Sequence, residues 1–143
     1  MIGAAHDRIL GLDYGTQRIG IAVTDPLGSM ALPLQNIDGS KGWPYLVNEL
    51  NTLIQKYSIG RIVVGNPKTL KGEIGLRAEE VLKFVDKLKR SIDTPITLWD
   101  ERLSSKAVER ILIEKGLSRE KRKTQIDAEA AAFFLQGYLD AQK

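Results

Sequence analysis

LGLDYGTQRIGIAVTD, residues 10–25, is the stretch of sequence that decides the fold. Apolar residues fill two short segments, 9–13 and 19–24, and DYGT between them favours a tight turn, so the pattern predicts two paired strands. The first predicted strand ends on a charged residue, Asp13. A carboxylate at the end of an apolar strand needs a structural or chemical reason, because charged groups are rarely placed where they lose contact with water.

Apolar patterns outside this hairpin predict the remaining elements of one α/β domain. Short apolar runs predict three further strands, at 31–37, 61–65 and 96–101. Apolar residues at helical spacing predict four helices, around 46–57 and 81–88, then over 105–115 and from near Thr124 onward. Three early strands followed by alternating helices and strands indicate a mixed sheet flanked by helices.

Length and composition limit the class of protein. The chain has 143 residues, of which 43% are hydrophobic, enough for a single domain spanning 1–143. Cysteine is absent, which excludes disulfides, thiolate metal sites and a cysteine nucleophile. No apolar run approaches the roughly 18 residues of a membrane span, and the first residues lack the apolar core of a signal peptide. We therefore expect a cytoplasmic protein without a membrane segment.

The charge balance permits a nucleic-acid partner without requiring one. Lys and Arg number 21 against 18 Asp and Glu, which gives a net charge of +3. One basic cluster lies in SREKRKTQ, between the last two predicted helices, and comprises Arg119, Lys121, Arg122 and Lys123. This basic cluster is either a phosphate-binding segment or a solvated loop.

Many acidic residues lie among lysines and arginines, on faces that we expect to be exposed to water, namely Glu73, Glu79, Glu80, Glu109, Glu114 and Asp140. Three other places differ. Asp13 ends the first strand, and Asp100 and Glu101 end the 96–101 strand. Asp127 falls on an apolar helical face with Ala130, Ala131, Phe134 and Tyr138. These four carboxylates are the candidates for a functional site.

Each of these positions also has a purely structural explanation. Asp13 could serve the DYGT turn, and Asp100 could cap the helix that follows it. Thr124 with Asp127 matches a capping box. Their joint position favours a common site, since strand ends and the start of a packed helix converge in α/β folds.

Carboxylates gathered at one site need a cation. Two unit charges about 4 Å apart repel by about 4 kcal/mol at an effective dielectric constant of 20. A divalent metal ion compensates such a cluster. Hard oxygen ligands in a chain without cysteine favour Mg²⁺ or Mn²⁺ over zinc.

Histidine and tryptophan are the other side chains with distinctive chemistry. The one histidine, His6, lies near the N-terminus, and we do not expect it to be catalytic. Trp43 and Trp99 are able to stack on bases, yet we expect both to pack in the core. None of the three enters the predicted metal site.

Four motifs, in order along nearly the whole chain, resemble the YqgF (RuvX) family, small relatives of the Holliday-junction resolvase RuvC in the ribonuclease H-like superfamily. They are LGLDYGTQRIGIAVTD, VVGNPKTLKGEIGLRAEEV, LWDERLSS and IDAEAAAFFLQGYL. The resemblance implies a ribonuclease H-like fold, with a central five-stranded mixed sheet whose first three strands are antiparallel. The central loop departs from the family pattern near Asn66 and Lys71.

The resemblance also implies a metal-dependent nuclease. It places the family's acidic triad on Asp13, Glu101 and Asp127, with Asp100 as an accessory or alternative ligand. Hydrolysis of this kind uses two cations about 3.5–4 Å apart to activate water and hold the scissile phosphate. The phosphate-binding residues that we expect are Thr16, Arg18, Lys71, Arg102 and the basic cluster.

Two substrates follow from the resemblance. The first is the 5′ end of pre-16S rRNA, ranked first on family grounds, and the second is branched DNA, whose paired cuts favour a symmetric dimer. We expect a monomer or a weak homodimer. A non-catalytic nucleic-acid-binding module in ribosome assembly is a further alternative. LGLDYGT also resembles the first phosphate loop of actin-like and sugar-kinase ATPases, but those enzymes close two such domains over a nucleotide and this length provides one.

Overall fold

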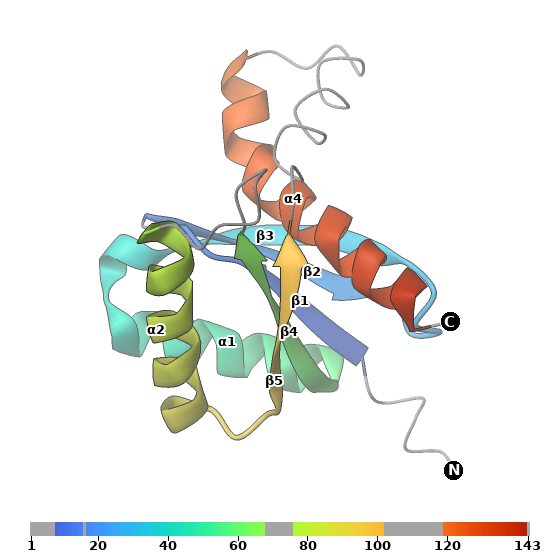
Figure 1. Ribbon diagram of the computed structural model, residues 1–143, viewed down its shortest axis with the longest axis horizontal. Helices are drawn as coiled ribbons and strands as arrows, with labels where there is room; N and C mark the ends of the chain where they lie inside the picture. Colours follow the sequence, from blue (N-terminus) through green and yellow to red (C-terminus); the bar gives the residue numbers. More distant parts are fainter. Residues whose placement is uncertain (1–7, 16, 68–75, 102–118, 143) are drawn as a thin grey trace.

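The computed structural model describes residues 8–15, 17–67, 76–101 and 119–142. Within them, a five-stranded sheet has helices packed on both of its faces (Figure 1). The elements in chain order are β1 (Arg8–Asp13), β2 (Arg18–Thr24), β3 (Ala31–Asp38), η2 (Gly39–Lys41), α1 (Trp43–Tyr57), β4 (Ile59–Pro67), α2 (Leu76–Ser91), β5 (Ile96–Glu101) and α4 (Arg119–Ala141).

The sheet has the strand order β3-β2-β1-β4-β5. The first three strands pair antiparallel, and β4 and β5 run parallel to β1. This topology confirms the predicted mixed sheet. The predicted strand at 61–65 is longer than expected, because β4 continues to pair with its neighbours at both ends.

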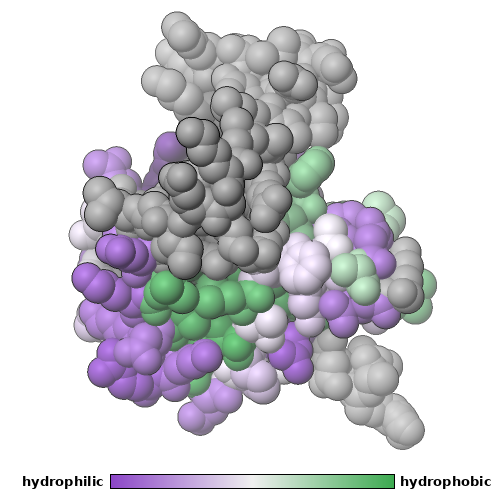
Figure 2. All heavy atoms as spheres, viewed as in Figure 1, coloured by the Kyte–Doolittle hydropathy of each residue, from purple (hydrophilic) through white to green (hydrophobic). Residues whose placement is uncertain are grey.

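Large aliphatic side chains fill the face of the sheet that α1 and α2 cover, which we call the α1–α2 face. Leu10 and Leu12 of β1 are fully buried there, together with Leu50 of α1 and Leu88 of α2. The outer side of α2 is hydrophilic, as Figure 2 shows. Both helices are therefore amphipathic, and burial of their apolar stripes holds them on the sheet.

The opposite face, which we call the α4 face, is built from smaller residues. Its buried cluster includes Ala22, Ala131 and Ala132. A Cβ atom added to Gly11 of β1 would lie 3.1 Å from Cδ2 of Leu135, closer than ordinary van der Waals contact. Small side chains thus let α4 lie directly against the central strands.

The start of α4 differs from the sequence prediction. The helix begins at Arg119, and the expected start near Thr124 is wrong. The basic cluster therefore belongs to the first turns of a helix, which corrects its placement in a loop between helices. Thr124 lies inside α4, so the capping-box explanation of Asp127 is also wrong.

Two further expectations concern the helix predicted over 105–115 and the absence of a membrane-spanning segment. The predicted helix over 105–115 lies outside the described residues. Among the helices that the structure describes, none combines the length and the apolar character needed to cross a bilayer.

Candidate functional site

Asp13 ends the central strand of the sheet. Its neighbours are Gly20 of β2 on one side and the parallel strand β4 on the other, so the backbone is held on both sides. The residue is only 4% exposed. Burial of a carboxylate requires compensation by positive charge or hydrogen bonds, so this position is unusual for an acidic residue.

The carboxyl ends of the parallel strands meet at the same edge. Leu12 pairs with Val64 of β4, and Val64 pairs with Leu98 of β5. Three residues further along, Pro67 pairs with Glu101. The last residues of β1, β4 and β5 therefore form one edge, which we call the strand-end edge.

The alternation of β1 assigns Asp13 to one face. Successive residues of a strand alternate between the two faces of a sheet. Gly11 approaches Leu135 of α4, whereas Leu12 belongs to the α1–α2 cluster. Asp13 is therefore on the α4 face of the strand-end edge.

The same alternation separates the two acids of β5. Leu98 packs with the α1–α2 cluster, and Trp99 packs with the α4 cluster. Residue 100 lies two positions after Leu98 and shares its face of the sheet. Residue 101 lies two positions after Trp99 and shares the opposite face. By register, Glu101 shares the α4 face with Asp13, while Asp100 belongs to the other face.

Helix α4 leads toward the strand-end edge on this face. The backbone N–H of Ala31, at the opposite edge, donates to Oε1 of Gln136 over 2.9 Å. The carbonyl oxygen of Ala131 would lie 3.5 Å from a Cβ on Gly11. Asp127 precedes Ala131 by about one helical turn, and Figure 1 shows the first half of α4 extending past the arrowheads of β4 and β5. The backbone thus brings position 127 to the same edge.

The structure describes only part of the predicted site. Asp13 is described in full, whereas Asp100, Glu101 and Asp127 are placed by backbone position. Among the side chains in the described ranges, no group of three His, Cys, Asp or Glu residues is arranged to hold a metal ion. Arg18 is exposed at the start of β2, close to the strand-end edge. The remaining predicted phosphate ligands outside α4 lie outside the described residues, namely Thr16, Lys71 and Arg102.

Two other acids, at the ends of β2 and β3, serve local turns. Asp38 accepts hydrogen bonds from the hydroxyl and the backbone N–H of Ser40, which lower its pKa. Asp25 lies at the opposite edge of the sheet. The backbone N–H of Met30, followed by smaller contributions from Ser29, lowers the pKa of Asp25. Both carboxylates are held ionised by the turns they close.

The two tryptophans lie on opposite faces of the sheet. Trp99 packs edge-on against Tyr138, with ring centroids 5.4 Å apart, which confirms core packing. Trp43 is half-buried on the α1–α2 face, and its Nε1–H donates to Oγ of Ser91. It also lines a pocket of about 300 Å³ that the sequence patterns did not reveal.

Sequence comparison places the chain among known proteins. A family model described as "RuvX: Holliday junction resolvase" matches residues 7–141. Proteins from Halothermothrix orenii and Desulforamulus reducens, whose names describe them as candidate pre-16S rRNA nucleases, are 47% and 48% identical to this chain. Each match covers 94% of this chain and at least 96% of the relative.

Structural comparison agrees with this relationship at the level of the fold. RuvC of Thermus thermophilus, solved in complex with a Holliday junction substrate, matches with a TM-score of 0.55. The match covers 96% of each chain at 15% sequence identity. A further Thermus thermophilus RuvC structure gives a TM-score of 0.51. The chain therefore has the ribonuclease H-like fold.

Proposed function

This chain belongs to the RuvX family, and we propose that it is a metal-dependent endonuclease that hydrolyses phosphodiester bonds of structured nucleic acid. Pre-16S rRNA is the proposed substrate, because the names of the relatives with 47% and 48% identity describe nucleases of that RNA. Its 5′ end is the proposed place of cleavage, as the family resemblance implies. The proposed place of action is the cytoplasm, with the protein as a monomer or a weak homodimer.

One observation carries this proposal. A buried carboxylate, Asp13, ends the central strand at an edge where two other acidic positions arrive on the same face. Position 101 arrives by the register of β5, and position 127 arrives along α4. Acids from three separate elements on one face are difficult to explain by local turns.

The donor chemistry fits Mg²⁺ or Mn²⁺. Asp13, Glu101 and Asp127 offer hard oxygen ligands, and the chain has no cysteine that would favour a softer metal. When bound, such ions supply water activation and neutralisation of charge on the phosphate. Asp13 would be the central ligand because the paired backbone on both sides fixes it. Glu101 and Asp127 would complete the ligand set, with Asp100 as an accessory residue on the other face.

Basic residues would hold the flanking phosphates. Arg18 is exposed near the strand-end edge, and the basic cluster forms the first turns of α4. Guanidinium and ammonium groups at these places would bind phosphates on either side of the cleaved bond. Thr16, Lys71 and Arg102 complete the proposed set.

A cleavage assay tests this function. Wild-type protein and Asp13→Asn would be incubated with pre-16S rRNA and with a four-way DNA junction, each in Mg²⁺, in Mn²⁺ and in EDTA. We expect metal-dependent product from the rRNA with the wild type and a loss of at least about a hundredfold in the variant, since the proposed reaction depends on metal-bound charge stabilisation. Product from the junction alone would favour the resolvase activity that the family description gives. Product from neither substrate would contradict the nuclease proposal and favour a binding module.

A further inference from the structure

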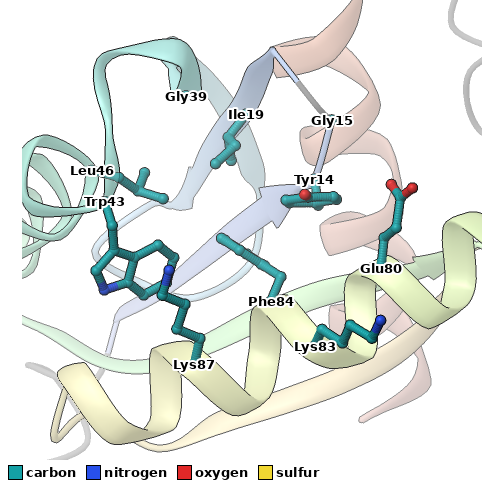
Figure 3. A pocket seen from close by; sticks show the side chains of 10 residues that line it. All are labelled: Tyr14, Gly15, Ile19, Gly39, Trp43, Leu46, Glu80, Lys83, Phe84 and Lys87. Carbon is teal, nitrogen blue, oxygen red and sulfur yellow. The ribbon is translucent and has the colours of Figure 1, made fainter.

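A pocket of about 300 Å³ opens on the α1–α2 face, next to the strand-end edge (Figure 3). Three aromatic residues line it, Tyr14, Trp43 and Phe84. The rings of Tyr14 and Phe84 lie 4.5 Å apart between centroids, and those of Trp43 and Phe84 lie 6.0 Å apart. The volume is at the lower end of the range for small-ligand sites, so it suits a compact group such as one nucleotide.

Charged side chains of α2 border the aromatic lining. Lys83 and Lys87 are exposed and contribute to the pocket, as does Glu80. The ammonium group of Lys87 lies 4.3 Å from the ring centroid of Trp43. The indole Nε1–H of Trp43 donates a hydrogen bond to Oγ of Ser91, which helps to fix the orientation of the ring. The pocket thus combines packed aromatic rings with two exposed lysines.

The pocket and the proposed metal site are adjacent along the chain. Asp13 is on the α4 face, and the next residues, Tyr14 and Gly15, line the pocket on the other face. A Cβ atom on Gly15 would lie 2.5 Å from the carbonyl oxygen of Arg18, so glycine is needed for this close turn. A nucleic-acid strand held at Asp13 would therefore pass close to the mouth of the pocket.

We propose that this pocket binds one unstacked nucleotide of the nucleic-acid strand, with its base against the aromatic residues and its phosphate on Lys83 and Lys87. This inference rests on the proposed nuclease function and adds a binding subsite to it. Aromatic side chains stack on unpaired bases of any identity, and lysines bind the backbone phosphates. A base at Trp43 would displace the ammonium of Lys87, which would then be available to the phosphate. The carboxylate of Glu80 would be an acceptor for amino groups on the base.

Trp43 itself reports on occupation. The chain has two tryptophans, so Trp99→Phe leaves Trp43 as the single indole. The probe is a short single-stranded oligoribonucleotide, titrated in EDTA so that metal-dependent cleavage cannot occur. An abasic oligonucleotide of the same length and charge is the control for stacking. We expect the complete oligonucleotide to quench Trp43 emission and the abasic one to leave it unchanged.

Lysine substitutions test the phosphate half of the inference. Lys83→Ala and Lys87→Ala should each make the slope of log K against log salt shallower by roughly 0.7, the value for one phosphate contact on a single strand. The matched control is Lys89→Ala, an exposed lysine of the same helix that does not line the pocket. Its slope should equal that of the unsubstituted protein.

Three results would overturn the inference. They are unchanged Trp43 emission when fluorescence anisotropy shows the oligonucleotide bound, equal quenching by the abasic strand, and equal slope changes for Lys83→Ala and Lys89→Ala. Quenching by a free mononucleotide but not by the strand would assign the pocket to a small ligand and overturn the strand subsite. Because binding is measured in EDTA, its outcome is separate from cleavage. Quenching without any cleavage would contradict the nuclease proposal alone, and cleavage without quenching would contradict the pocket alone.

Discussion

The two faces of the sheet are packed in different ways. On the α1–α2 face, large aliphatic residues such as Leu12 and Leu50 separate the helices from the strands. On the α4 face, Gly11 and Ala131 allow the helix to lie almost in contact with the central strand. The α4 face has the acidic positions at the strand ends, and the α1–α2 face has the aromatic pocket. Both proposed sites thus lie at the same edge, on opposite faces of the sheet.

The largest predicted effect is on the face that depends on large side chains. Leu50 is fully buried, and Leu50→Ala should lower the free energy of unfolding by about 2–5 kcal/mol through lost burial and a residual cavity. Denaturant unfolding of both proteins measures this difference. Leu82→Ala is the matched control, because Leu82 is 44% exposed and should change stability far less. Equal losses for both variants would contradict the assignment of the core.

The face that depends on small side chains should be destabilised by added volume, whereas the α1–α2 face is destabilised by lost volume. Gly11→Ala adds a methyl group 3.1 Å from Leu135 and should cost about 1–3 kcal/mol, less any gain from a stiffer unfolded chain. The double variant with Leu135→Ala removes the nearest obstructing atom, Cδ2, and keeps the Cβ atom of residue 135 at 3.2 Å. Denaturant unfolding of all four proteins forms a double-mutant cycle, and we expect the double variant to lose less than the sum of the single changes. Additive losses would mean that α4 does not lie closely against Gly11.

The first turns of α4 should contact the nucleic acid through charge alone. If the basic cluster binds phosphates, Arg122→Ala with Lys123→Ala should make the slope of log K against log salt shallower by roughly 1.4–1.8, depending on whether the strand is single or double. Binding measured over a salt series gives this slope. Trp43 quenching should persist in this variant, because the aromatic pocket lies on the other face. An unchanged slope would mean that the basic cluster is solvated by water and does not bind phosphates.

The smallest effect concerns a carboxylate that serves only a turn. Asp25 has a lowered pKa in the folded state, so its stabilising contribution is present above the ordinary Asp value and is lost as the pH falls through the lower, folded value. Asp25→Asn should therefore be less stable than the wild type at neutral pH, and the difference should shrink below about pH 4. Thermal melts over a pH series measure it. A difference that is constant with pH would show that ionisation of Asp25 is irrelevant to the turn.

The sequence predicted the sheet well because apolar periodicity decides it. The strands at 9–13 and 96–101 are rich in apolar residues, and the structure places them within one residue of the predicted bounds. The start of α4 was missed because REKRKT has no apolar stripe, although its Arg, Glu and Lys residues have good helix propensity. The pocket was missed because Tyr14, Trp43 and Phe84 come from three separate segments, and only the fold brings them together.

The sequence indicated that these acids lie at strand ends and on a helix face. It did not indicate the register in which the strands pair. The choice between Asp100 and Glu101 depends on which residue of β5 pairs with which residue of β4. A shift of one position would exchange them. The faces taken by Leu98 and Trp99 supply that information, and they favour Glu101 as the partner of Asp13.

Thermal melts of wild type and Asp13→Asn, each in EDTA and across a magnesium titration, test the metal site most directly and need no substrate. Converging carboxylates repel one another without metal, so the variant should be as stable as the wild type in EDTA, or more stable. At ten times its dissociation constant, magnesium should stabilise the wild type by about 1.4 kcal/mol and raise its melting temperature by a few degrees. The variant should lose most of that rise. A variant clearly destabilised in EDTA, with the same response to magnesium as the wild type, would contradict the assignment of Asp13 as a metal ligand.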